Sequence, residues 1–299
     1  MALMQDDFVA PFSLDSAPVR GRVARVAGAA LDPILRRHDY PWPVAMLLGE
    51  AITLAALVGS LLKVEGRLVV QAQGQGPVPL LVAEHQSGGG LRGYARLADG
   101  AGDMLAREGR MAPAALLGAG RLVMTLDFGG GEAPYQGVVE LSGETLAACA
   151  ERYFRTSEQT ETRIALAVGE VVGAGAPQWR GGGVLMQRIA ADDARGDPAE
   201  DWSRASHLFA TVTDEEMLDP ALPADRLLYR LFHEEGARMG AREPLADHCT
   251  CSAERLANAM KSFPAEEVSD LVEPDGRVHA RCQFCAREYQ LEPALLGVR

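Results

Sequence analysis

The chain has few basic residues for its length. Its 29 lysines and arginines face 41 aspartates and glutamates, which gives a formal net charge of −12 with neutral histidines. An acidic chain is poorly matched to a polyphosphate or to an anionic membrane surface. We therefore expect neither nucleic acid nor a membrane among its partners.

The chain also lacks a long uncharged apolar run. Its longest apolar stretch, Val44–Val64, is interrupted by Glu50 and Lys63, and the twelve residues between these two charges are too few to span a bilayer. The first residues, Met1–Phe12, contain two aspartates and no basic region of the kind that opens a signal peptide. We expect a cytoplasmic protein, in which reducing conditions keep thiols free.

Catalytic and nucleotide-binding motifs are missing as well. There is no G-x-S-x-G elbow and no H-E-x-x-H, and His233-Glu234-Glu235 lacks the second histidine of a zinc protease helix. The glycine clusters, including Gly129–Gly131 and Gly181–Gly183, do not continue into a phosphate-binding loop, so they are expected to be turn and bulge glycines. We expect a protein that is not an enzyme and does not use ATP.

The hydrophobic pattern of residues 1–188 predicts an α+β core domain. Helical periodicity covers Val23–Arg37, Val44–Val64 and Glu144–Arg155, and a further strand is expected at Arg163–Val172. Five segments alternate with period 2 between Gly-rich turns such as Gly74–Gly76 and Gly88–Gly90: Leu68–Gln73, Leu80–Glu84, Leu91–Arg96, Arg121–Phe128 and Tyr135–Leu141. Strands at this spacing favour a mostly antiparallel sheet backed by packed helices.

Residues 189–243 are interpreted as a helical linker. The segment Ala191–Pro220 carries nine acidic residues and two basic ones, which marks a change in composition. Large apolar residues nevertheless recur at helical spacing in and beyond it: Trp202, Leu208, Phe209, Leu227, Leu228, Leu231 and Phe232. The pattern predicts amphipathic helices that need a partner surface, and a permanently docked helical hairpin would satisfy it as well as a movable one.

Four of the five cysteines lie in the last fifth of the chain, as Cys249-Thr250-Cys251 and Cys282-Gln283-Phe284-Cys285. Two such pairs can hold one zinc ion tetrahedrally, although a C-x-C first half is unusual for a zinc ribbon. His248 or His279 could replace one thiolate, but four cysteines already fill a tetrahedron. Two disulfides in a secreted domain are the other alternative, which the missing signal peptide disfavours.

The expected C-terminal zinc-binding domain, residues 244–299, is too small to be stable through its core alone. Zinc contributes apparent free energies on the order of 10–16 kcal/mol to such domains, so removal of the metal should unfold this one. Thiolates are also the species that oxidants attack, and a disulfide is no longer an anionic ligand. The spacing leaves both an inert structural site and an oxidation sensor open. The remaining cysteine, Cys149, is interpreted as a small buried apolar residue.

Several segments resemble the heat shock protein 33 family of redox-regulated chaperones over almost the full chain. They are His38-Asp39-Tyr40-Pro41, Leu48-Gly49-Glu50-Ala51, Leu91-Arg92-Gly93-Tyr94, Tyr135-Gln136-Gly137, Tyr153-Phe154, Ser157-Glu158-Gln159, Arg230-Leu231-Phe232-His233-Glu234-Glu235 and Cys282-Gln283-Phe284-Cys285. One departure is that Glu161 stands before Thr162, where the family usually has proline.

The resemblance implies an ATP-independent holdase that binds unfolding client proteins under oxidative stress. It implies that zinc bound by Cys249, Cys251, Cys282 and Cys285 keeps the protein inactive. Oxidation would then pair Cys249 with Cys251 and Cys282 with Cys285, release zinc, and give an active homodimer. The alternative is a zinc-ribbon regulatory or interaction protein with a purely structural four-cysteine site. A zinc hydrolase would need an open coordination position, and four cysteine ligands leave none.

Overall fold

The computed structural model describes residues 6–129, 131, 133–141, 145–172, 176–190 and 198–297. The chain divides into two compact units, residues 1–247 and 248–299, and each has its own hydrophobic core. The start of the predicted helix at Glu144 and part of the acidic segment, residues 191–197, lie outside the described residues. Whether residues 189–243 act as a separate linker stays a prediction.

The first unit contains two six-stranded sheets, so the predicted α+β class and the antiparallel pairing are confirmed. One sheet has the order β10 (Ala237–Met239), β1 (Phe8–Leu14), β2 (Val19–Val26), β9 (Gln178–Arg188), β8 (Thr162–Val171), and β11 (Glu243–Pro244) also pairs with β1. The other has the order β12 (Ala246–Asp247), β5 (Gly90–Arg96), β4 (Leu80–Gln86), β3 (Arg67–Gly74), β6 (Gly120–Asp127), β7 (Tyr135–Leu141). The short β12–β5 pair is parallel and the other pairs are antiparallel.

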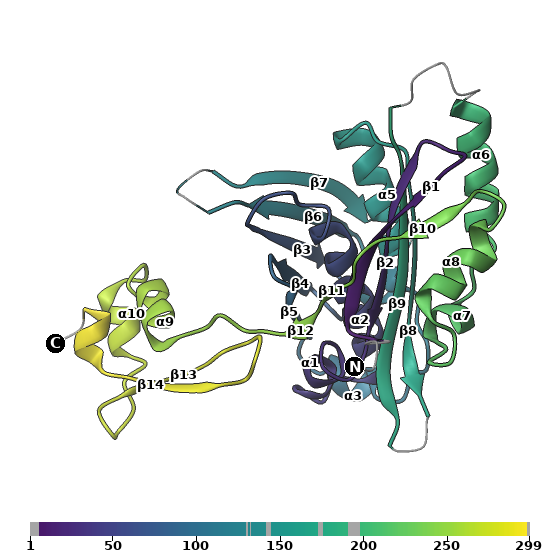
Figure 1. The fold of residues 1–299 in the computed structure, drawn as a ribbon. Coiled ribbons are helices and arrows are strands. Elements are labelled where there is room, and N and C mark those ends of the chain that lie inside the picture. Colours follow the sequence, from purple (N-terminus) through teal and green to yellow (C-terminus); the bar gives the residue numbers. More distant parts are fainter. Residues whose placement is uncertain are drawn as a thin grey trace, which may run out of the picture. The chain divides into compact units, whose positions relative to one another are not determined.

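Helix α2 (Trp42–Gly59) is the centre of this unit. It packs on β3, β4 and β5 of one sheet and on β2, β8 and β9 of the other (Figure 1). Its length and composition would allow it to cross a membrane, but 89% of its apolar window is buried inside the protein, as in a core helix. The predicted buried helix is confirmed, although it ends at Gly59 rather than Val64. A Cβ atom at Gly59 would lie 2.4 Å from Nδ1 of the buried His85, so the helix approaches β4 closely there.

Smaller helices complete the first unit. They are α1 (Asp32–Arg36), α3 (Ala101–Leu105), α4 (Pro113–Leu117) and α5 (Leu146–Ser157). Thr145 is the N-cap of α5, and its hydroxyl accepts a hydrogen bond from the backbone N–H of Ala148. The predicted helix over this region is thus confirmed where the structure describes it.

The prediction of a helix over Val23–Arg37 is wrong for its first half. Residues Val19–Val26 form β2, an inner strand that pairs with β1 on one side and β9 on the other, and only α1 is helical. The apolar spacing of this segment also fits a helix. Hydrogen bonds to β9, a strand far from this segment in the chain, decide in favour of the sheet.

The prediction of turn glycines holds for Gly88 and Gly89, which have positive φ values of 90° and 86° in the β4–β5 turn. It is wrong for Gly181–Gly183, which lie inside β9. A Cβ atom at Gly182 would lie 2.2 Å from the Met217 carbonyl oxygen, and one at Gly183 would lie 2.7 Å from Leu57. These glycines therefore let a helix approach each face of the strand closely.

Three helices from the predicted linker cover the second face of the β1–β2–β9–β8 sheet: α6 (Pro198–Phe209), α7 (Asp214–Leu218) and α8 (Ala224–Phe232) (Figure 1). Their apolar residues share one buried cluster with the inner strands, including Phe8 and Phe12. A capping box of Thr213 and Glu216 begins α7. The amphipathic helices are confirmed, and their partner surface is this sheet.

Two buried arginines on the sheet hold the end of α7. The Arg25 guanidinium donates to the carbonyl oxygens of Met217, Asp219, Glu216 and Leu222 at 2.5–3.3 Å. Arg180 donates to the Leu218 carbonyl at 3.0 Å and pairs with Asp6. Carbonyls at a helix C-terminus have no partner within the helix, so these guanidiniums satisfy them.

The second unit, residues 248–299, is small. It consists of α9 (Ala253–Met260), α10 (Ala265–Ser269), β13 (Val278–Arg281), β14 (Glu288–Leu291) and the 3₁₀ helix η2 (Pro293–Leu296). Strands β13 and β14 form an antiparallel hairpin. Its core has five buried apolar residues, Ala257, Val268, Val278, Leu291 and Leu296. A core of this size supports the expectation that something besides apolar packing stabilises the unit.

A candidate metal centre in residues 248–299

The four cysteines of the second unit occupy two turns. Cys249 and Cys251 lie directly before α9, whose first turn is capped by the Ser252 hydroxyl. Cys282 and Cys285 lie in the turn between β13 and β14. Two backbone hydrogen bonds close that turn: the Cys282 N–H donates to the Arg287 carbonyl at 2.9 Å, and the Ala286 N–H donates to the Cys282 carbonyl at 2.8 Å. Both turns thus fix the backbone that carries the sulfurs.

The four sulfur atoms converge on one point. All lie within 4.8 Å of one another. Two contacts join one cysteine of each pair, Cys249 with Cys282 at 3.8 Å and Cys251 with Cys285 at 3.3 Å. A zinc–sulfur bond of about 2.3 Å implies sulfurs about 3.8 Å apart around a tetrahedron. The sulfur cluster could therefore hold a metal ion, and its dimensions fit zinc.

The ionisation of these thiols favours a bound cation. Burial raises the pKa of Cys251, but hydrogen bonds from Tyr289 and the other thiols outweigh it and lower that pKa to about 7. Burial and the neighbouring sulfurs raise the pKa of Cys285 to about 12. The Cys251 thiol ionises easily, whereas ionisation of Cys285 is opposed, because a second negative charge would lie close to the first. A divalent cation removes that repulsion.

The two nearby histidines are not part of this sulfur cluster among the described residues. His279 is exposed on β13, and its Nε2 lies 2.8 Å from an Asp275 carboxylate oxygen. Hydrogen bonding to that carboxylate raises the pKa of His279. His248 precedes Cys249 in the chain, and the four cysteines alone make up the group of possible ligands at this site.

Sequence reasoning missed Tyr289, whose hydroxyl oxygen lies 3.0 Å from the Cys251 sulfur. The residue lies on β14, four positions after Cys285, and this closeness in the chain is the signal that sequence reasoning could have used. Its contact with Cys251, which is 38 positions earlier, depends on how the two turns pack together.

Cys149 lies apart from this site in the first unit. It is fully buried on α5 within the main hydrophobic core, and its sulfur lies 4.0 Å from the Glu140 carbonyl oxygen. The interpretation of Cys149 as a small buried apolar residue is confirmed.

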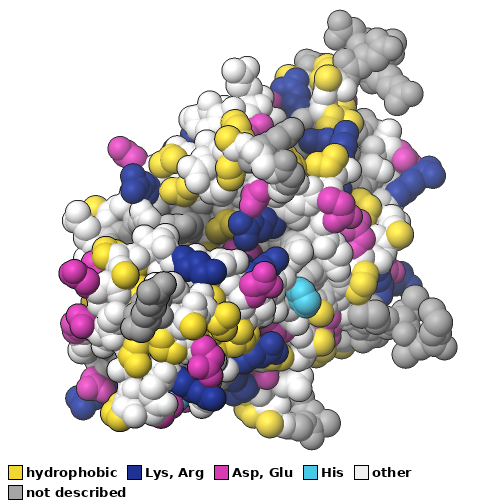
Figure 2. Space-filling view, turned by 90° about the vertical axis from the view of Figure 1, so that its left-hand side faces the viewer, with side chains coloured by type: hydrophobic (Ala, Val, Ile, Leu, Met, Phe, Trp, Pro, Cys, Tyr) yellow, Lys and Arg dark blue, Asp and Glu magenta, His cyan; other side chains and the backbone are white. Residues whose placement is uncertain are grey.

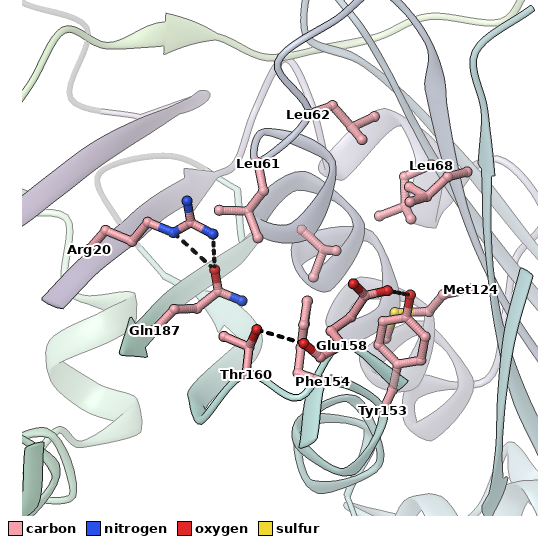
Figure 3. Close-up of a pocket in the computed structure, with 12 residues that line it drawn as sticks. Arg20, Leu61, Leu62, Leu68, Met124, Tyr153, Phe154, Glu158, Thr160 and Gln187 are labelled. Atoms are coloured by element: carbon pink, nitrogen blue, oxygen red, sulfur yellow. Dashed lines mark hydrogen bonds between the residues drawn. The ribbon is translucent and has the colours of Figure 1, made fainter. Parts of the chain in front are cut away.

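A pocket of about 160 Å³ lies in the first unit (Figure 3). Its apolar lining includes Leu61, Leu62, Leu68, Met124 and Phe154. At its rim Arg20 donates to the Gln187 side-chain oxygen at 3.1–3.3 Å, and the Tyr153 hydroxyl donates to Glu158 at 2.7 Å. The pocket is smaller than the about 300–1,000 Å³ typical of small-molecule sites. It suits a single apolar side chain better than a cofactor.

Charges of both signs are mixed on the surface shown in Figure 2, where lysine and arginine side chains lie beside aspartate and glutamate and among hydrophobic ones. Arg67–Asp127 is a partly exposed ion pair, whereas the Arg92–Glu84 pair is mostly buried. The face shown in Figure 2 therefore differs from the continuous basic stripe of a nucleic-acid interface.

Comparison with known proteins gives one consistent family. The model of the family described as "Hsp33 protein" matches residues 7–292. The chain is 51% identical to a 33 kDa chaperonin of Caulobacter vibrioides over 290 residues, which cover 96% of this chain and 95% of that protein. It is 37% identical to a 33 kDa chaperonin of Cronobacter sakazakii over 298 residues, covering 99% and 96% of the two chains.

The fold has a counterpart among solved structures. The crystal structure of a 33 kDa chaperonin from Thermotoga maritima superposes with a TM-score of 0.76 and covers 97% of each chain at 22% identity. At that identity the likeness establishes the fold, and the family assignment depends on the sequence matches.

Proposed function

This chain belongs to the Hsp33 protein family, and we propose on that premise that it is a redox-regulated, ATP-independent holdase that prevents aggregation of unfolding proteins. Family membership supports a chaperone function, because the similar proteins carry the name 33 kDa chaperonin. Its partners are unfolding client proteins in the cytoplasm, and its active form is a homodimer. It catalyses no reaction.

In the reduced state Cys249, Cys251, Cys282 and Cys285 hold one zinc ion. The ion supplies a positive charge that keeps all four sulfurs as thiolates and links the two turns. The convergence of four sulfurs within 4.8 Å is the single observation that carries this proposal. The small apolar core of the unit supports a stabilising role for the metal.

Oxidation by hydrogen peroxide converts the thiolates into disulfides. A thiolate sulfur attacks a peroxide oxygen, the O–O bond breaks, hydroxide leaves, and a cysteine sulfenic acid forms. The neighbouring thiolate then attacks that sulfur, and a second hydroxide leaves as the S–S bond forms. We assign the disulfides to Cys249–Cys251 and Cys282–Cys285. Each consumes one peroxide, and zinc departs because a disulfide is not an anionic ligand.

In this proposal, loss of zinc unfolds residues 248–299, and detachment of helices α6 and α8 from the sheet is a second, separate step. Helices α6 and α8 bury one apolar face each, with Trp202, Phe209, Leu228 and Phe232 in the shared cluster. If they detach, apolar residues of both the helices and the sheet become available to clients. Exposed apolar surface and mobile amphipathic segments suit a chaperone that binds many partners.

The test is light scattering of a heat-denatured client with reduced, zinc-loaded protein and with peroxide-treated protein. We expect the oxidised form to suppress aggregation and the reduced form to have little effect. Equal suppression by both forms would contradict redox control and leave a constitutive chaperone. Zinc retained after peroxide treatment, together with binding of a specific partner, would instead favour the regulatory zinc-ribbon protein.

A further inference from the structure

The Tyr289 side chain is built against one sulfur of the cluster. Its hydroxyl oxygen lies 3.0 Å from the Cys251 sulfur, and its backbone pairs with Ala280 across the β13–β14 hairpin. The same hairpin carries Cys282 and Cys285. The hydroxyl is therefore held in place by the element that also positions two of the other three sulfurs.

The direction of this hydrogen bond follows from the chemistry of the sulfur. A cysteine that binds a metal is a thiolate, which has no proton to donate, so the Tyr289 hydroxyl must be the donor to Cys251.

We propose that Tyr289 protects Cys251 from oxidants and thereby sets the rate at which the site opens. This inference rests on the proposed redox function. The sulfur attacks peroxide with a lone pair and loses negative charge as it does so, so a hydrogen bond to that sulfur must weaken in the transition state. The reaction itself is unchanged: Cys251 displaces hydroxide from hydrogen peroxide, and Cys249 then displaces hydroxide from the sulfenic acid.

The variant Tyr289→Phe removes the hydroxyl and keeps the ring. The full-length protein is loaded with zinc and mixed with excess hydrogen peroxide, and zinc release is followed with a chromogenic chelator. We expect release about five- to tenfold faster than in the unsubstituted protein, because a hydrogen bond to a charged group is lost. The control Tyr229→Phe removes an exposed phenol hydroxyl from α8 and should leave the rate unchanged. An equal or slower rate in Tyr289→Phe overturns the proposal.

A second measurement separates protection of one sulfur from general loosening of the unit. Iodoacetamide alkylates thiolates without any oxidation, and mass spectrometry gives the rates at Cys251 and Cys282 separately. We expect Tyr289→Phe to raise the Cys251 rate relative to the Cys282 rate, whereas loosening would raise both together and contradict the proposal. If the unsubstituted protein keeps its zinc in peroxide, the redox function fails, and the alkylation ratio still decides the role of Tyr289.

Discussion

At the residue scale, the cysteines fall into two groups, those of the candidate metal centre and the one in the hydrophobic core. Cys282 is buried, whereas Cys249, Cys251 and Cys285 are partly exposed, so a small oxidant has access to three of the four sulfurs. Cys149 is fully buried in the other unit. Residues of one type therefore have different chemistry because their exposure and neighbours differ.

Cysteine substitutions test the ligand set. We expect Cys282→Ser to lower the bound zinc from one ion per chain to well below one, because serine is a poor zinc ligand and three thiolates leave the tetrahedron incomplete. Zinc content measured against protein concentration checks this. Cys149→Ser is the matched control and should keep its zinc. Full zinc binding by Cys282→Ser would remove this residue from the proposed ligand set.

Glu50 on α2 gives a prediction for pH. Burial raises the pKa of this partly buried carboxyl to about 7, with Arg110 opposing the shift and Asp214 adding to it. The folded state therefore binds more protons than the unfolded state between about pH 4.5 and 7, and stability falls as the pH rises through that window. Glu50→Gln cannot ionise, so it should match the unsubstituted protein near pH 4.5 and exceed its free energy of unfolding by roughly 2–3 kcal/mol at pH 8.

Urea unfolding of the first unit at several pH values measures this difference. Glu108→Gln removes an exposed carboxylate and should leave the pH profile unchanged. A difference between Glu50→Gln and the unsubstituted protein that stays constant with pH would contradict the raised pKa.

At the scale of elements, the helices α6, α7 and α8 are attached to the sheet in two ways. Helices α6 and α8 contribute apolar side chains to the shared cluster. The end of α7 is held by charged hydrogen bonds from Arg25 and Arg180 to backbone carbonyls. The second kind of attachment depends strongly on single residues, because a buried carbonyl without a donor is costly.

Arg25→Met should weaken this attachment. The substitution removes the donor to four carbonyl oxygens, so we expect the free energy of unfolding to fall by roughly 3 kcal/mol and residues 213–223 to become sensitive to protease. Arg230→Met is the control, because Arg230 forms exposed contacts with Thr211 and Glu216, and it should cost at most about 1 kcal/mol. Equal losses in the two variants would show that Arg25 has no special role.

At the scale of the whole molecule, two units with hydrophobic cores of very different size share one chain. The first unit has extensive cores on both faces of the β1–β2–β9–β8 sheet, and the second has five buried apolar residues. Apolar burial is the main source of folding free energy, so the larger unit can remain folded when the smaller one does not.

Removal of zinc should therefore unfold one unit selectively. After treatment with a chelator we expect hydrogen exchange in residues 248–299 to approach that of an unfolded chain, while α2 and the sheets around it keep their protection. Hydrogen-exchange mass spectrometry with and without added zinc makes the comparison, and protection should return when zinc is restored. Unchanged protection in residues 248–299 would mean that the metal does not stabilise the unit.

Some features are local in the sequence, and the sequence by itself determined them. The spacing of Cys249, Cys251, Cys282 and Cys285 predicts sulfurs that converge, since a tight turn places both sulfurs of a pair on one side. The largely apolar helix α2 and the hairpin pairs β3–β4, β4–β5 and β6–β7 were likewise predictable, because their hydrogen bonds lie within one helix or between strands that follow each other in the chain.

Only the tertiary structure decided the features that join distant residues. Strand β2 is a strand because β1 and β9 flank it, and Gly181–Gly183 are needed because α2 and α7 approach β9 from opposite faces. Tyr289 on β14 contacts Cys251, 38 positions earlier, because the two cysteine turns pack together. Such contacts depend on the free energy of the whole packed unit, which a local window of sequence does not contain.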